Sequence, residues 1–306
     1  MIIAVFPGQG SQTPGFLLPW LELDGARDRL AAYSEQAGVD LIAAGTEWDA
    51  DRIRDTSVAQ PLIVAASLLS WAALNDRAGA SVHGVAGHSV GEIAALAASG
   101  VLSDDDALRL VGLRGRAMAE AAAAVETGMG AVVGGDEQTV LERLDVLGLT
   151  PANYNGGGQI VAAGELSALA ELASEAPRGA RVIALQVAGA FHTRFMEPAV
   201  ETLRAAAADV AVSDPSTTLW TNSDGSVVAE GRRALDLVVA QVASPVRWDR
   251  CMLSFAEHGV TGIIEMSPAG ALTGLAKRAL RGTPTVAVKT PDDLDAAVSL
   301  LKEEQA

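Results

Sequence analysis

Cysteine is nearly absent from this sequence, in which Cys251 is the only one among 306 residues. A single cysteine excludes an intramolecular disulfide and a metal site made of several thiolates, and it fits a reducing, cytoplasmic compartment. Basic residues are also scarce, because 22 Lys and Arg stand against 38 Asp and Glu and give a formal net charge of −16. A general nucleic-acid-binding protein needs a basic face to neutralise phosphates, so we expect no nucleic-acid partner.

Long apolar runs are missing too, since none approaches the ~20 residues that span a bilayer, and we expect no membrane contact. The first residues, 1–6, have no basic flank and no small-residue cleavage pattern, so they are typical of a strand and not of a signal peptide. What the chain does have is 49% hydrophobic and 20% charged residues, the composition of a globular protein able to bury a large core.

The order of strand and helix patterns predicts a large α/β body that carries a small insert. In the body we expect a strand at 2–6, a buried helix at 58–75, a helix from the N-cap Ser103 to 124, a strand at 263–265 and a last helix at 272–280. In the insert we expect strands at 129–133, 152–154, 159–163 and 181–187 and helices at 137–146 and 165–174. That β-α-β-β-α-β order is typical of a ferredoxin-like unit. We therefore predict one subdomain of residues 1–126 and 191–306, a second of residues 127–190, and an active site in the cleft between them.

The most informative motif is Gly87-His88-Ser89-Val90-Gly91, which lies between an expected strand at 82–86 and an expected helix. In that context G-x-S-x-G predicts a nucleophile elbow, a sharp turn that exposes the serine hydroxyl near the positive end of the helix. The backbone N–H of Val90 would then stabilise an oxyanion that forms beside the serine. An ordinary glycine-rich turn is the alternative interpretation, and the flanking strand and helix favour the nucleophile.

A nucleophilic serine needs a base, and the sequence offers four histidines. His88 adjoins Ser89 and should point away from it, His83 should lie at the far end of the sheet, and His258 is typical of a structural residue at a helix C-terminus. His192 lies where the insert returns to the body, which would place it at the rim of a cleft, so its position favours it as the base. No aspartate stands out as a third triad member, so we expect something else, such as a main-chain carbonyl, to orient the imidazole.

Eight motifs along the chain resemble, in the same order, those of the malonyl-CoA:acyl-carrier-protein transacylase family. They are FPGQGSQ (6–12), TSVAQP (56–61), GHSVGE (87–92), RGRAM (114–118), NYN (153–155), GAFH (189–192), QVASPVRW (241–248) and LTGL (272–275). The resemblance covers essentially the whole chain. It implies an α/β-hydrolase-like body with the ferredoxin-like insert and no metal or organic cofactor. We also expect a monomer. The implied reaction carries a malonyl group from malonyl-CoA to the phosphopantetheine thiol of an acyl carrier protein, by a ping-pong route through a malonyl-serine.

The resemblance also implies roles for individual residues. Ser89 would be the nucleophile and His192 the general base, with the main-chain carbonyl of Gln241 orienting the imidazole. Gln9 and the N–H of Val90 would form the oxyanion hole. The usual elbow of this family has Leu where this chain has Val90, which should be harmless because the position contributes its N–H.

Five further residues would bind the substrate in this family: Gln60, Arg114, Met118, Asn155 and Phe191. A guanidinium such as that of Arg114 matches the two oxygens of the malonyl carboxylate with two parallel N–H groups. Phe191 matches the malonyl-selective form, because relatives that take methylmalonyl tend to have a smaller residue there. For docking an acidic carrier protein the candidate basic residues are Arg181, Arg194, Lys277, Arg278 and Arg281.

Other functions remain open on sequence grounds. Within the family, the chain could serve polyketide synthesis or a malonate decarboxylase complex instead of fatty acid synthesis. Outside it, a serine esterase could share the elbow, although an arginine in the acyl pocket disfavours neutral acyl groups. A carrier-docking module without catalysis would have no use for Ser89, His192 and Gln9 together.

Overall fold

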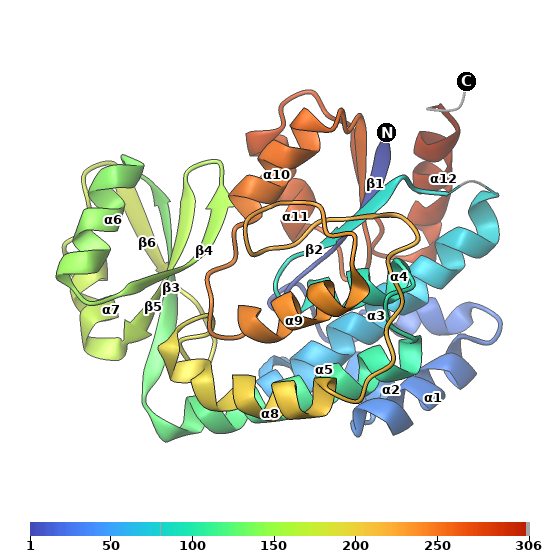
Figure 1. Ribbon diagram of the computed structural model, residues 1–306, viewed down its shortest axis with the longest axis horizontal. Coiled ribbons are helices and arrows are strands. Elements are labelled where there is room, and N and C mark those ends of the chain that lie inside the picture. The colour runs from blue at the N-terminus through green and yellow to red at the C-terminus, as the bar shows by residue number, and fades with distance from the viewer. Residues whose placement is uncertain (80, 304–306) are drawn as a thin grey trace.

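The computed structural model describes residues 1–79 and 81–303, and its larger part is built around a parallel sheet (Figure 1). The strands run in the order β7-β2-β1-β8-β9. Their bounds are β1 Ile2–Phe6, β2 Gly84–Gly87, β7 Thr218–Leu219, β8 Gly262–Glu265 and β9 Thr285–Ala287. All of β1 is buried, as its unbroken apolar sequence predicts for a central parallel strand covered on both faces.

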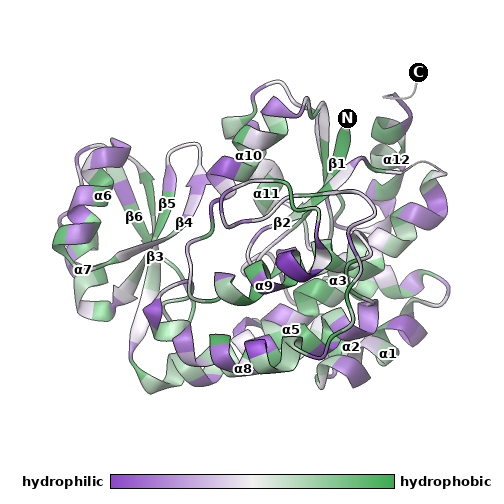
Figure 2. Ribbon diagram, viewed as in Figure 1, coloured by the Kyte–Doolittle hydropathy of each residue, from purple (hydrophilic) through white to green (hydrophobic). Residues whose placement is uncertain are grey.

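Helices cover both faces of this sheet, and the side chains of β1 alternate between them. Ile3 and Val5 belong to the apolar cluster that includes residues of the helices at 248–257 and 271–279, whereas Ile2, Ala4 and Phe6 belong to the larger cluster that includes residues of the helices at 56–78, 91–98 and 104–124. The helices are α1 Ala26–Ala37, α2 Leu41–Thr46, α3 Thr56–Ala78, α4 Gly91–Ala98, α5 Asp104–Ala124, α8 Glu197–Ala207, α9 Gly231–Gln241, α10 Trp248–Glu257, α11 Ala271–Ala279 and α12 Leu294–Glu303, with short 3-10 turns at Leu18–Glu22, Arg52–Arg54, Arg194–Met196 and Pro291–Asp293. Figure 2 shows that outer helices such as α8 carry both hydrophilic and hydrophobic residues.

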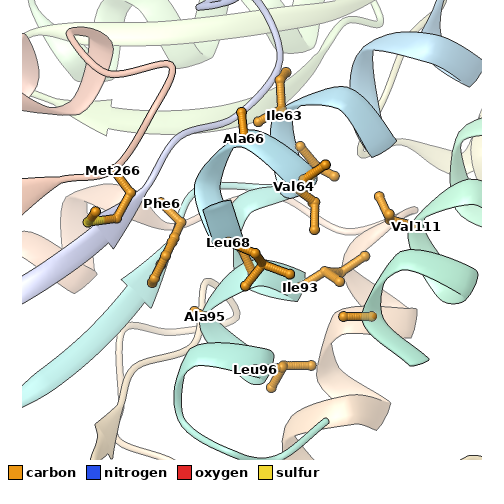
Figure 3. Packing of buried hydrophobic residues seen from close by; sticks show 14 of the residues in the cluster. Phe6, Ile63, Val64, Ala66, Leu68, Ile93, Ala95, Leu96, Val111 and Met266 are labelled. Carbon is orange, nitrogen blue, oxygen red and sulfur yellow. The ribbon is translucent and has the colours of Figure 1, made fainter. Parts of the chain in front are cut away.

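Helix α3 lies at the centre of the larger core. Val64 and Leu68 of α3 lie near Ile93 of α4 and Val111 of α5 (Figure 3), and Ile63 of α3 belongs to the same cluster. By length and composition α3 could cross a membrane, which corrects the expectation that no apolar segment is long enough. In the structure 72% of its apolar window is buried inside the protein, which is typical of a core helix.

Helix α5 begins as the sequence predicts. The hydroxyl of Ser103 accepts the backbone N–H of Asp106, and three aspartates occupy the first turn near the positive end of the helix. Its glycines allow a close approach to other helices, because a Cβ on Gly115 would lie 2.8 Å from the Thr56 carbonyl oxygen at the start of α3. This packing brings Arg114, the neighbour of Gly115, against α3.

Residues 127–184 form a separate antiparallel sheet, on the left in Figure 1, in the order β4-β5-β3-β6. The elements are β3 Thr127–Gly134, α6 Glu137–Val146, β4 Thr150–Gly156, β5 Gln159–Glu165, α7 Leu166–Ser174 and β6 Ala180–Ala184. They follow in the expected order, and α6 has the expected bounds. The last strand ends earlier than the predicted 181–187, because the regular pairing with β3 ends at Ala184.

The smaller sheet is packed onto the larger part. The backbone N–H of Tyr154 in β4 donates to the carbonyl of Val246, and the N–H of Val246 donates to the carbonyl of Ala152, both at 2.9 Å. On β3, Met129 and Ala131 contribute to the core of the larger part, while Val132 and other residues form a core with α6 and α7.

Candidate active site

Three loops meet where parallel strands end at the same edge of the larger sheet. Phe6 at the end of β1 pairs with Gly87 at the end of β2, and β7 pairs with β2 on its other side. The segments that follow these strands carry Gln9, Ser89 and Asn222 respectively. Because the carboxyl ends of adjacent parallel strands lie side by side, residues far apart in the sequence come together here.

The turn that carries Ser89 is the sharp one predicted from G-x-S-x-G. Ser89 has a φ of 53°, in the left-handed region that disfavours a side chain. Both motif glycines are required by close packing: a Cβ on Gly87 would lie 2.0 Å from the carbonyl carbon of Gly91, and one on Gly91 would lie 2.2 Å from the Phe6 oxygen. The strand before the turn is β2, which begins at Gly84 and not at the expected residue 82.

Ser89 and His192 lie within hydrogen-bond distance, with Oγ 2.8 Å from Nε2. The other ring nitrogen, Nδ1, lies 2.8 Å from the main-chain carbonyl oxygen of Gln241. A carbonyl only accepts, so Nδ1 carries the proton and Nε2 is left to accept from the serine hydroxyl. His192 has a φ of 63°, and among the described residues it and Ser89 are the only non-glycines with a positive φ. Backbone strain of this kind concentrates at functional sites.

The environment of His192 favours its neutral form. Its side chain is buried, and burial, followed by the positive charge of Arg114, lowers the pKa of the imidazole to about 3. The hydrogen bond to Gln241 acts in the opposite direction but is the weaker effect. A neutral imidazole that contacts a serine hydroxyl is able to remove its proton at physiological pH.

The first loop of the chain lies against the serine turn. A Cβ on Gly8 would lie 3.0 Å from the carbonyl oxygen of His88 and 3.7 Å from the Cβ of Ser89, so the residue before Gln9 packs against the serine turn. The side-chain amide of Gln9 is turned to the carbonyl of Arg54 at 3.2 Å. Within the described part of the chain, the backbone N–H groups of Gln9 and Val90 donate to no other residue. They are therefore available to an oxyanion.

Arg114 is fully buried, and its guanidinium contacts two neutral amides. Nη1 donates to Oε1 of Gln60 at 2.6 Å, and Nη2 donates to Oε1 of Gln241 at 3.1 Å. Its Nε has no hydrogen-bond partner among the described residues. Burial lowers the pKa of Arg114 to about 10, and the nearby Glu92 opposes this shift, so the guanidinium stays charged. A buried cation held only by neutral groups is suited to an anionic ligand.

The remaining predicted substrate residues differ in where they lie. Met118 contacts Gln60, whose Nε2 lies 3.4 Å from the sulfur, so Gln60 links Met118 to Arg114. Phe191 is buried, and it directly precedes His192 in the sequence. Asn155 does not contact Ser89 or Arg114; its Oδ1 lies 2.9 Å from Nε2 of His88. The structure thus gives Asn155 a contact with the serine turn, and its implied contact with substrate stays a prediction.

The other histidines lie where the sequence placed them. His88 points away from Ser89, packs against Trp248 with ring centroids 5.6 Å apart, and has a pKa lowered by burial. Nδ1 of His83 accepts the backbone N–H of Ile2 at 3.1 Å, at the opposite end of the sheet from the serine. His258 follows α10, and its Nδ1 lies 2.8 Å from the carbonyl of Ser254.

Sequence reasoning missed two buried residues of the site, Glu92 and Asn222. Asn222 holds the serine turn, because its Oδ1 accepts the N–H of Ser89 at 2.8 Å and its Nδ2 donates to the Gly87 carbonyl at 2.6 Å. Its own N–H donates to Oε1 of Glu92 at 2.9 Å. Burial raises the pKa of Glu92 to about 7 against the effect of these hydrogen bonds. Glu92 stood in the GHSVGE motif without a role, and Asn222 had no sequence signal.

All five residues proposed to dock a carrier protein are exposed: Arg181, Arg194, Lys277, Arg278 and Arg281. None of them forms an ion pair within residues 1–79 and 81–303. Arg278 of α11 lies against the smaller sheet, since a Cβ on Gly157 in the β4–β5 turn would lie 3.1 Å from the Cβ of Arg278.

Comparison with known proteins agrees with this geometry. A family model described as acyl transferase domain matches residues 3–301. The chain belongs to the acyl transferase family. This acyl transferase is 55% identical over 303 residues to the malonyl CoA-acyl carrier protein transacylase of Mycobacterium tuberculosis, covering 98% of this chain and all of the relative.

Two solved structures have the same fold along nearly the whole chain. The crystal structure of MCAT from Mycobacterium tuberculosis superimposes on this acyl transferase with a TM-score of 0.94 at 55% identity, over 97% of this chain and 100% of the other. A malonyl-transacylase solved in complex with its type II polyketide synthase acyl carrier protein has a TM-score of 0.92 at 29% identity, over 98% of this chain and 99% of the other.

Proposed function

We propose that this acyl transferase moves the malonyl group of malonyl-CoA to the phosphopantetheine thiol of an acyl carrier protein and so supplies extender units for fatty acid synthesis. The observation that carries this proposal is the double role of Gln241. Its main-chain carbonyl contacts the imidazole of His192, and its side-chain oxygen contacts Arg114. One residue therefore links a group suited to deprotonate Ser89 with a cation suited to bind the far carboxylate of a malonyl thioester.

In the first half-reaction, Nε2 of His192 takes the proton of the Ser89 hydroxyl while Oγ attacks the thioester carbonyl of malonyl-CoA. The N–H groups of Gln9 and Val90 bind the oxyanion of the tetrahedral intermediate. When that intermediate collapses, the C–S bond breaks, and the CoA sulfur leaves with the proton held by His192. The product is malonyl-Ser89, an ester.

The second half-reaction reverses these steps with a different thiol. The phosphopantetheine thiol of the carrier gives its proton to Nε2 of His192 and attacks the ester carbonyl. The same two N–H groups bind the oxyanion, and Ser89 leaves with the proton. Because both half-reactions use the same base and the same oxyanion hole, CoA leaves before the carrier thiol reacts, and the kinetics are ping-pong.

We also propose the finer division of the fold. Residues 1–126 and 191–306 form an α/β-hydrolase-like subdomain and residues 127–190 a ferredoxin-like one, with the active site in the cleft between them. The sheet order β4-β5-β3-β6 and the separate apolar core around Val132 support this division. The low cysteine content supports a cytoplasmic location.

The carrier protein is the less defined partner. One similar structure is a malonyl-transacylase in complex with a polyketide synthase carrier protein, so polyketide synthesis is the alternative role. An esterase is disfavoured, because a neutral acyl group would leave the buried charge of Arg114 without a counterion.

Intact-protein mass spectrometry tests the proposal. After brief exposure to malonyl-CoA the wild-type protein should gain one malonyl group, and addition of carrier protein with its phosphopantetheine arm should remove it. Ser89→Ala should show no adduct. An adduct that persists in Ser89→Ala would refute the assignment of the nucleophile.

A further inference from the structure

Glu92 lies in the buried interior between the serine turn and Arg114, and the reaction described above gives it no task. It stands in the first turn of α4, and its side chain is 3% exposed. A carboxylate is costly to bury unless its oxygens accept hydrogen bonds from well-placed donors. Both oxygens do: Oε1 accepts the backbone N–H of Asn222, and Oε2 accepts Nε2 of Gln241.

The side-chain amide of Gln241 lies between this carboxylate and the guanidinium of Arg114. Its Oε1 accepts from Nη2 of Arg114 at 3.1 Å, and its Nε2 donates to Glu92 and also faces the Ser89 carbonyl and Oδ1 of Asn222, each at 3.2 Å. A reversed amide would place its N–H groups against the guanidinium and its oxygen against the carboxylate, which is unfavourable at both ends. The acceptor oxygen of Glu92 on one side and the donor N–H of Arg114 on the other allow a single orientation.

We propose that Glu92 is a positioning residue that fixes the side-chain amide of Gln241, so that Gln241 holds Arg114 in place for the carboxylate of the acyl group. This inference rests on the function proposed above. Glu92 acts through Gln241 and forms no direct ion pair with Arg114 within the described residues. The guanidinium therefore keeps N–H groups for a ligand, among them the Nε without a partner.

The test compares two acyl donors in variants of Glu92. Glu92→Gln keeps the size of the side chain and removes its charge, so the amide of Gln241 is no longer held in one orientation. We expect kcat/KM for malonyl-CoA to fall about tenfold or more, mainly through KM, while kcat/KM for acetyl-CoA falls less, by the part of the effect that reaches the serine turn through Asn222. Glu92→Asp keeps the carboxylate but moves it one methylene farther from Gln241. Its malonyl-to-acetyl ratio should therefore lie between those of Glu92→Gln and the wild type. A role in folding alone would lower both rates together and leave this ratio unchanged.

Glu265 provides a matched control. It is also a fully buried glutamate, and its two oxygens accept the backbone N–H groups of Leu272 and Thr273, both at 2.8 Å, with no contact to Gln241. Glu265→Gln should lower the thermal midpoint of unfolding and leave the malonyl-to-acetyl ratio as in the wild type.

The possible outcomes separate this inference from the proposed function. A wild-type protein that forms no malonyl-serine or does not prefer malonyl-CoA overturns both. A wild type that prefers malonyl-CoA, with a folded Glu92→Gln variant of unchanged ratio, overturns only the role of Glu92. A raised ratio also overturns it, because Glu92 would then act by repelling the acyl carboxylate. Should Glu92→Gln fail to fold, Glu92→Asp takes its place: a ratio below wild type supports positioning, and an equal ratio overturns it.

Discussion

Replacing Arg114 by Ala should change which acyl group the enzyme accepts more than it changes the chemistry at Ser89. The guanidinium is fully buried and contacts only the neutral oxygens of Gln60 and Gln241. Malonyl-CoA supplies a carboxylate that can pair with it, and acetyl-CoA does not. We therefore expect Arg114→Ala to lower kcat/KM sharply for malonyl-CoA and to raise the rate with acetyl-CoA relative to it.

The size of the effect follows from the cost of an unpaired buried charge. Removing one partner of a buried ion pair costs about 3–5 kcal/mol. Since each ~1.4 kcal/mol is a factor of ten, the wild type should prefer malonyl-CoA over acetyl-CoA by about two to three and a half decades, and Arg114→Ala should remove most of that preference. Arg114→Lys should recover only part of it, because an ammonium cannot make the bidentate pair.

The assay measures acylation of the enzyme by each donor. The release of CoA is monitored by stopped flow, and the acyl adduct by the mass of the intact protein. Arg116 gives a control on the same helix: it is exposed and donates to the carbonyl of Ala37 at 3.0 Å, away from the amides that hold Arg114. Arg116→Ala should keep the wild-type ratio. If Arg114→Ala leaves the malonyl-to-acetyl ratio of kcat/KM unchanged, the reasoning from the buried charge is wrong.

Three further predictions concern the base, the acyl pocket and the carrier. Because burial and the charge of Arg114 depress the pKa of His192 to about 3, the base stays unprotonated as the pH falls below 6.5, so the acid limb of kcat/KM for malonyl-CoA should lie well below that value. A limb near 6.5 would contradict this, and Arg114→Ala should move the limb to higher pH. Phe191→Ser should raise kcat/KM for methylmalonyl-CoA, because it should lower the activation free energy by the ~1–3 kcal/mol that one methyl group is worth in an apolar pocket. An unchanged kcat/KM would show that Phe191 does not border the 2-position of the acyl group. Charge reversal at Lys277 and Arg278 should slow transfer to the carrier and spare acylation by malonyl-CoA, whereas equal loss in both half-reactions would argue for a role in CoA binding.

Local patterns predicted the parts of this structure that depend on neighbouring residues. The buried run Ile2–Phe6, the N-cap at Ser103 and the elbow between β2 and α4 all follow from short stretches of sequence. The position of His192 was favoured by its place at the junction of the two parts, and its contact with Ser89 spans 103 residues. Position favoured His192 over the other histidines, and the resemblance to a family then assigned it to Ser89, because no local pattern pairs residues so distant.

The parts that could not be predicted depend on tertiary contacts. Asn222 follows a strand of two residues and contacts Ser89 across 133 positions, so neither periodicity nor a motif marks it. The contact of Asn155 with His88 spans 67 positions and had no sequence signal either, and its expected contact with substrate stays a prediction. A motif says that a residue type is needed at a position, and only the folded neighbours say which atom it contacts.

The arrangement around Gln241 explains why an amide, and not a carboxylate, holds Arg114. A direct ion pair between Arg114 and Glu92 would satisfy the guanidinium, and an incoming carboxylate would then have to displace a buried charge. An amide oxygen accepts one hydrogen bond without neutralising the cation, so the attraction for a second anion remains. Because the main-chain carbonyl of the same residue orients His192, a shift of Gln241 would disturb the base and the carboxylate site together. Replacing Gln241 therefore cannot separate catalysis from selectivity. Replacing Glu92 can, because its contact with Gln241 is through the side-chain amide and not the main-chain carbonyl, and the rate with acetyl-CoA reports any change that reaches the serine turn through Asn222.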